Sequence, residues 1–141
     1  MRGATLDQKR RKLLTERGLA SHMNDTKWRE LCAGIRELPF PPAYQVKVLD
    51  ENEPSPSTIE RAPPYWGDWA STPEAALGVH VEWIRVTPRY KRHVARLLPP
   101  IIEDCSDQLR SLLRRLRIPF VESDGLFTIY GHASGIDFDT T

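Results

Sequence analysis

The sequence has only two cysteines and no long apolar run, and both features exclude classes of protein. No stretch approaches the ~20 consecutive apolar residues of a membrane-spanning helix, and residues 1–22 lack the apolar centre of a signal peptide. Cys32 and Cys105 have neither metal-ligand nor redox spacing. We therefore expect a cytoplasmic protein with free thiols, no cofactor, no bound metal and no membrane partner.

Local catalytic motifs are missing too. The chain contains no G-x-S-x-G, Walker, G-x-G-x-x-G or H-E-x-x-H motif. His80-Val81-Glu82 has the H-x-E spacing of zinc deaminases, but no C-x-x-C is present to supply the other ligands. On a strand, His80 and Glu82 share a face, so an enzyme with a dispersed site near these two residues is one alternative function.

An excess of charge of one sign is also lacking, because 20 Lys and Arg residues nearly balance 19 Asp and Glu residues. The distribution is uneven, since residues 1–22 hold six basic and two acidic residues and little apolar surface for docking. We expect residues 1–22 to be a flexible basic extension upstream of a natural start at Met23; the alternative is an arm for nucleic acid or an acidic partner. Residues 23–132 then form a single domain, and residues 133–141 a polar tail.

Apolar periodicity predicts two helices. The first begins after the capping residues around Asn24, carries apolar residues at helical spacing from Trp28 to Leu38, and ends at Pro39. The second begins between Pro100 and Ser106 and stops before a further proline. Its predicted buried stripe consists of Ile102, Cys105, Leu109, Leu112, Leu113 and Leu116.

Four strands accompany these helices. Tyr44–Val48 alternates, and residues 79–86 alternate with Val81 and Trp83 on one face and Ile84 on the other. Asp124-Gly125 predicts a two-residue turn that pairs residues 120–123 with residues 126–130, Phe120 opposite Ile129. The fold class is therefore α+β, with a single small mixed or antiparallel sheet of about four strands and two helices packed on one face.

Two segments outside these elements bear on function. Residues 50–78 form a long loop rich in acids and prolines, and it contains Tyr65-Trp66-Gly67-Asp68-Trp69, whose aromatic rings must fold back on the core or face a partner. Residues 84–117 hold nine basic and three acidic residues, with Tyr90 and His93 between them. The arginines either bind nucleic acid or are solvated and paired with acids of the same chain.

Three stretches resemble a family of small, functionally uncharacterised bacterial proteins. They are Trp83-Ile84-Arg85-Val86-Thr87-Pro88-Arg89-Tyr90, the helix from Leu109 into Ile118-Pro119-Phe120, and Asp124-Gly125-Leu126-Phe127-Thr128-Ile129-Tyr130-Gly131. The resemblance covers most of residues 24–132 and leaves residues 1–22 outside. It implies a small cytosolic protein and transfers no catalytic residue.

The aromatic loop, the acidic loop beside a basic helix and the missing catalytic motifs favour a non-catalytic protein-interaction module, such as an inhibitor or immunity-type partner of a larger protein. The first alternative is a nucleic-acid-binding protein that uses the arginines of residues 85–117. The candidate partner-binding residues are Trp66, Asp68, Trp69, Arg89, Arg92 and Arg114.

Overall fold

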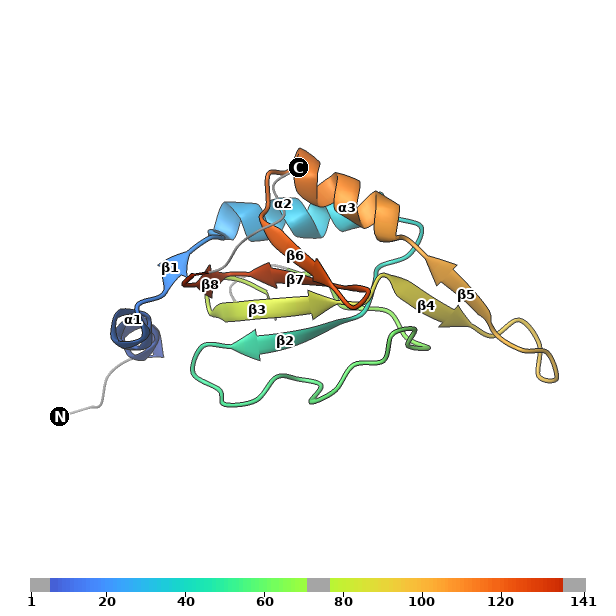
Figure 1. The fold of residues 1–141 in the computed structure, drawn as a ribbon, viewed down its shortest axis with the longest axis horizontal. Coiled ribbons are helices and arrows are strands. Elements are labelled where there is room, and N and C mark those ends of the chain that lie inside the picture. Colours follow the sequence, from blue (N-terminus) through green and yellow to red (C-terminus); the bar gives the residue numbers. More distant parts are fainter. Residues whose placement is uncertain (1–5, 71–76, 136–141) are drawn as a thin grey trace.

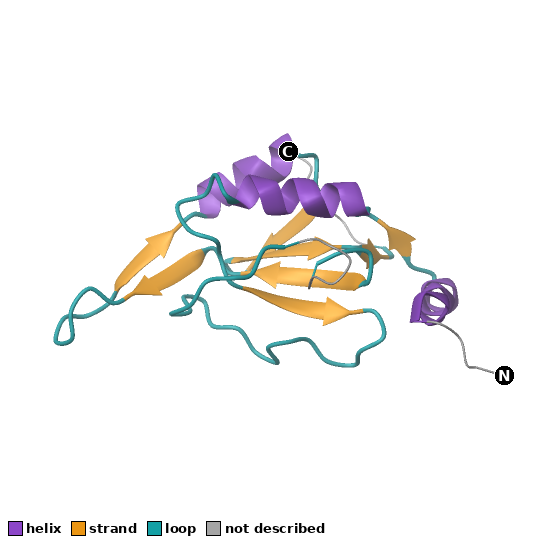
Figure 2. Ribbon diagram, turned by 180° about the vertical axis from the view of Figure 1, so that it is seen from behind, coloured by secondary structure: helices purple, strands orange, loops and turns teal. Residues whose placement is uncertain are grey.

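A four-stranded antiparallel sheet lies at the centre of the computed structural model, which describes residues 6–70 and 77–135 (Figure 1). Its order is β2-β3-β7-β6, with bounds Tyr44–Val48, Val81–Val86, Leu126–Tyr130 and Phe120–Ser123. Helices α2 (Asp25–Ile35) and α3 (Ser106–Arg115) both cover one face of this sheet (Figure 2). This arrangement confirms the predicted α+β class.

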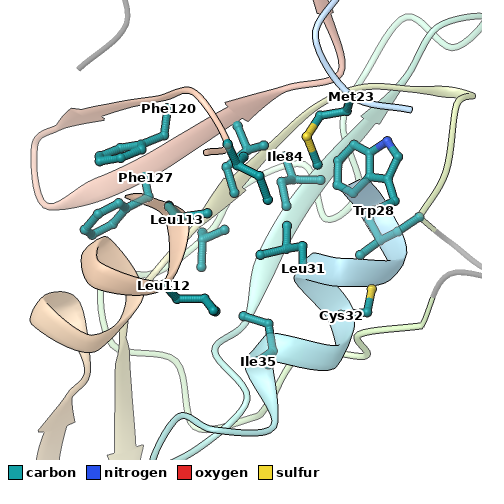
Figure 3. Packing of buried hydrophobic residues seen from close by; sticks show 14 of the residues in the cluster. Met23, Trp28, Leu31, Cys32, Ile35, Ile84, Leu112, Leu113, Phe120 and Phe127 are labelled. Carbon is teal, nitrogen blue, oxygen red and sulfur yellow. The ribbon is translucent and has the colours of Figure 1, made fainter. Parts of the chain in front are cut away.

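The core lies between the two helices and the covered face of the sheet (Figure 3). Trp28 and Leu31 of α2, Leu113 of α3, and Phe120 and Phe127 of the hairpin are all at most 1% exposed. Large apolar side chains that lose their water in this way supply most of the stabilising free energy of such a domain. Both cysteines are buried and free, as expected.

The start of α2 follows the prediction, because Asn24 caps the helix by accepting a 2.8 Å hydrogen bond from the Lys27 backbone N–H. The second helix begins at the last residue of the predicted interval, but one residue of its predicted buried stripe lies elsewhere. Ile102 lies in strand β5 (Ile101–Asp104), and α3 begins only at Ser106. A short apolar run directly before a helix carries no period of its own, so its assignment depended on tertiary pairing.

The predicted alternation along β3 is broken by a bulge. The pairing shifts between Lys47 and Val48, so that Lys47 faces Trp83 while Val48 faces Val81. The bulge adds one residue to β3 and so exchanges the two faces of the strand for the residues before it. Val81 therefore lies in the core with Ile84 instead of sharing a face with Trp83. The hairpin of β6 and β7, by contrast, has the predicted register, with Phe120 opposite Ile129.

The long loop after β2 runs back along the outer edge of that strand. Val46 and Ser55 exchange two backbone hydrogen bonds of 2.9 and 2.8 Å, and the Gln45 amide donates to the carbonyls of Pro56 and Ser57 at 3.0 Å. These bonds cover a sheet edge that would otherwise offer unpaired backbone groups. Residues 71–76 of the loop lie outside the described residues.

Smaller elements lie at the two ends of the sheet (Figure 1). At one end, residues of the predicted basic extension form α1 (Leu6–Arg17) and β1 (Ala20–Ser21), and β1 pairs with β8 (His132–Ala133). At the other end, β4 (Arg89–Arg92) and β5 form a separate antiparallel ribbon. Among the described residues no helix is long and apolar enough to cross a membrane. Residues 136–141 of the predicted tail lie outside the described residues.

Candidate functional site

The β4–β5 ribbon projects away from the rest of the domain (Figure 1). We call residues 89–104 the arm and residues 93–100, which connect its strands, the tip. Apolar side chains on the arm face solvent: Leu97 is 93% exposed, Leu98 60% and Ile102 50%. Val94 and Ile101 are exposed as well. Scattered surface leucines are ordinary, but five exposed aliphatic side chains on one projecting ribbon form an apolar surface that the described residues leave uncovered.

The base of the arm is firmly attached to the domain. The Tyr90 ring lies between the rings of Phe40 and Trp66, with centroid distances of 5.6 and 5.7 Å. The backbone N–H of Lys91 donates to the Pro63 carbonyl at 2.9 Å, on the side of β4 away from β5. These contacts fix the base of the arm against the domain.

Charge is unevenly distributed along the arm. The two acids lie in β5 near the base, where Glu103 pairs with Arg92 at 2.9 Å and Asp104 pairs with Arg89 at 3.2 Å. Towards the tip, Arg96 has no ion pair with any described residue, and no acid occurs between Arg89 and Ile102. The arm is therefore basic and apolar at its tip and electrically compensated at its base.

The two tryptophans in the long loop of residues 50–78 differ in exposure. Trp66 is 57% exposed and stacks on the base of the arm through Tyr90. Trp69 is half-buried against the core, where its ring lies 4.7 Å from that of Tyr44 and its Nε1–H donates to the Pro42 carbonyl at 2.7 Å. Of the two tryptophans in this loop, Trp66 is therefore the one whose ring is mostly exposed.

The remaining sequence candidates do not form one surface. Arg89 and Arg92 lie on the arm, but both have intramolecular ion pairs. Asp68 has an exposed carboxylate, and its backbone carbonyl accepts a hydrogen bond from the Tyr44 hydroxyl. Arg114 is exposed in the last turn of α3, the end of that helix that points away from the arm (Figure 1).

The apolar tip was missed by the sequence analysis. Its signal is the run Leu97-Leu98-Pro99-Pro100-Ile101-Ile102, in which aliphatic residues surround two prolines inside a basic segment. We assigned part of this run to the buried stripe of a helix. Exposure cannot be derived from the run itself, because the same residues are equally suited to a core.

The arginines of residues 85–117 are also dispersed. Arg85 packs over the Trp83 ring at 5.0 Å, on the sheet face opposite the helices. Arg110 of α3 pairs with Glu122 and Asp107, and Arg115 pairs with Glu37. Cations on two faces of a sheet, several of them neutralised, do not form the continuous basic surface that tracks a nucleic-acid backbone.

Glu82 lies in a cluster of charges rather than in a proton-transfer site. Arg17 donates to both of its carboxylate oxygens at 2.8 and 2.9 Å, and Lys47 donates to one of them at 3.0 Å. Burial by itself raises the pKa of Glu82, but these hydrogen bonds outweigh it and lower the pKa below its ordinary value. A carboxylate held in its ionised form by two cations is poorly suited to act as a general acid.

One polar pair was not anticipated at all. His132 is 4% exposed, and its Nε2 lies 2.8 Å from the Val79 carbonyl, to which it must donate because a carbonyl only accepts. In the neutral ring Nδ1 is then an acceptor for the Ser21 hydroxyl, 2.9 Å away. The two residues are separated by 111 positions, so no local pattern could reveal them. Among the described residues no cluster of three His, Cys, Asp or Glu side chains could hold a metal.

Comparison with known proteins gives a family but no function. The chain belongs to a family of unknown function, DUF6678, whose model matches residues 10–135. The match includes residues 10–22, which the resemblance noted in the sequence analysis left outside. Searches of the curated proteins and of the solved structures found no match.

Proposed function

We propose that this member of the DUF6678 family is a protein-interaction module that binds its partner through the arm and Trp66. The observation that supports the proposal is Leu97, a leucine that is 93% exposed at the end of a projecting, firmly attached ribbon. Covering one such side chain contributes about 2 kcal/mol to binding, and the arm offers four more aliphatic side chains. Trp66 adds a large ring of the kind that dominates protein interfaces.

The charge of the tip also indicates what kind of surface the partner has. The tip is apolar, carries Arg96 without an ion pair among the described residues, and contains no acidic residue. A partner with an acidic rim around an apolar groove complements both features. Complementary charges raise the rate of association and select against wrong partners more than they add affinity. An inhibitor or immunity-type protein uses a surface of this kind.

Site-specific photo-crosslinking tests the proposal. A photoreactive phenylalanine analogue replaces Leu97 in one version of the purified protein and Val79, an apolar residue away from the arm that is 49% exposed, in a control version. Irradiation with extract of the source cells is expected to give a discrete protein adduct from position 97 only. Excess unlabelled protein should suppress the adduct, whereas excess Leu97→Asp protein should not.

Two results contradict the proposal. The first is equal labelling from positions 97 and 79, which indicates random collision. The second is equal suppression by the unmodified protein and by the Leu97→Asp variant, which indicates that the tip makes no part of the contact.

A further inference from the structure

We infer that the arm pairs with the arm of a second copy of this chain, edge to edge along β5. This inference rests on the proposed function, because it names the occupant of the same surface. The partner strand is another Ile101–Asp104, which runs antiparallel to the first and converts two ribbons into one four-stranded sheet, β4-β5-β5-β4.

The first step concerns which backbone groups of β5 face outwards. In an antiparallel ladder, residues alternately point their N–H and C=O groups toward and away from the neighbouring strand. Lys91 points its N–H away from β5, toward Pro63, so Lys91 and the opposite residue Ile102 form a pair without mutual hydrogen bonds. Ile102 and, two residues later, Asp104 therefore direct their backbone groups to the outer edge of β5.

That outer edge is open among the described residues, since β5 pairs with β4 alone. The edge of β2, by comparison, is covered by Ser55 and the loop that contains it. An uncovered edge whose side chains include the exposed Ile101 and Ile102 is a template for another strand. Proteins usually protect an open edge with charges, and the charges of β5, Glu103 and Asp104, lie near its base, where arginines of β4 neutralise them, so the isoleucine half of the edge stays apolar.

Charge then decides between the two closest registers. A twofold axis at Glu103 places this carboxylate directly opposite its own copy, which is unfavourable. A twofold axis at Ile102 places Ile102 opposite Ile102 and Ile101 opposite Glu103. In this second register the Ile102 residues exchange two hydrogen bonds, and each Asp104 N–H donates to the Pro100 carbonyl of the other copy. The Asp104 carbonyl receives no bond in return, because Pro100 has no N–H.

The register at Ile102 also suits the distribution of charge along the arm. Because the arms run in opposite directions, each basic tip lies beside the base of the other arm and the start of its α3. Arg96 thus approaches Asp104 and Asp107. Each already pairs with an arginine of its own chain, but the Asp107 side chain is 94% exposed and has room for a second cation. A second copy therefore supplies both the apolar cover and the acidic groups that the tip lacks in the monomer.

A cysteine in place of Ile102 tests the register directly. The residues of a hydrogen-bonded antiparallel pair have Cα atoms about 5.5 Å apart, within the range of a disulfide. Ile102→Cys is therefore expected to form an intermolecular disulfide in air, seen as a dimer by mass under non-reducing conditions. Val79→Cys is the matched control, because Val79 and Ile102 are 49% and 50% exposed, and the native thiols are buried.

Equal dimer yields from the two cysteine variants would overturn the inference. A second measurement does not depend on any cysteine: sedimentation equilibrium of the unmodified chain should show a monomer–dimer equilibrium. Ile102→Lys places two cations opposite each other and should raise the dimer dissociation constant roughly tenfold or more, whereas Val79→Lys should not. A monomer at all concentrations also refutes the inference.

These experiments distinguish failure of the pairing of two copies from failure of the proposed function. If the chain is monomeric but position 97 still gives an adduct of larger mass with a different protein, the arm binds a heterologous partner and only the pairing of two copies fails. If position 97 gives neither a homodimer adduct nor any other, both proposals fail.

Discussion

Arg17 at the end of α1 donates two hydrogen bonds, of 2.8 and 2.9 Å, to the carboxylate of Glu82 in β3. Glu82 is 9% exposed, and Lys47 of β2 donates a third hydrogen bond to it. A second ion pair, from Arg10 to Asp50 at 3.1 Å, lies farther along α1. The basic segment that the sequence placed outside the domain is thus joined to the sheet by ion pairs, and Leu13 and Leu14 of α1 are half-buried as well.

Glu82→Gln should destabilise the domain. The substitution removes the charge that Arg17 and Lys47 surround and leaves two cations close together, so we expect a loss of about 1–2 kcal/mol, less than for a fully buried pair because Arg17 is 42% exposed. Urea unfolding measures the difference. Glu16→Gln, which breaks the exposed pair with Lys12, should change stability by less than about 0.5 kcal/mol.

The same carboxylate gives a prediction for acid. The pKa of Glu82 is lower in the folded chain than its ordinary value of 4.5, so its contribution to stability is complete above that pH and is lost as the pH falls through the folded pKa. The stability of the unmodified chain should therefore fall more steeply below pH 4.5 than that of Glu82→Gln. Parallel pH profiles of the two proteins would contradict the assignment.

The two loop tryptophans should respond oppositely to substitution. Trp69→Ala removes a ring packed on Tyr44 and a hydrogen bond to Pro42, so it should cost about 2–3 kcal/mol of folding free energy. Trp66→Ala should change stability by less than about 1 kcal/mol, because Trp66 is mostly exposed, yet weaken partner binding tenfold or more. Thermal unfolding and binding titrations separate the two effects.

Both thiols should be unreactive in the folded protein. Burial, with the nearby Asp68 carboxylate, raises the pKa of Cys32 to about 11, and burial, with the Asp104 carboxylate, raises the pKa of Cys105 to about 12. The reactive thiolate is therefore scarce at pH 8. A chromogenic disulfide reagent at that pH should label neither residue in the native chain and both in denaturant; rapid labelling of the native chain contradicts the burial.

The elements that could be predicted from the sequence are those that local chemistry determines. Asp124-Gly125 specifies a tight turn because both residues adopt positive φ, at 54° and 76°, and the register of the hairpin follows from it. Asn24 marks the start of α2 for a similarly local reason, since a short polar side chain reaches the free N–H of Lys27.

The candidate site depended on contacts between distant residues. Trp66 is exposed and Trp69 is half-buried, but the sequence could not separate the two, because the difference is set by Tyr44 and Pro42 more than 20 positions away from Trp69. Ile102 was assigned to a helix stripe because its four-residue surroundings carry no period, and only the pairing with Lys91 makes it a strand.

Propensity and apolar spacing act over a few residues, and they were enough to predict the α+β class, the hairpin, the cap of α2 and the burial of both cysteines. Three other features arise only in the folded chain: α1 is joined to β3 through Glu82, a bulge turns Val81 into the core, and Leu97 is exposed to solvent at the end of an arm. Each of these depends on which distant segments the folded chain brings together, and short-range spacing carries no information about that choice.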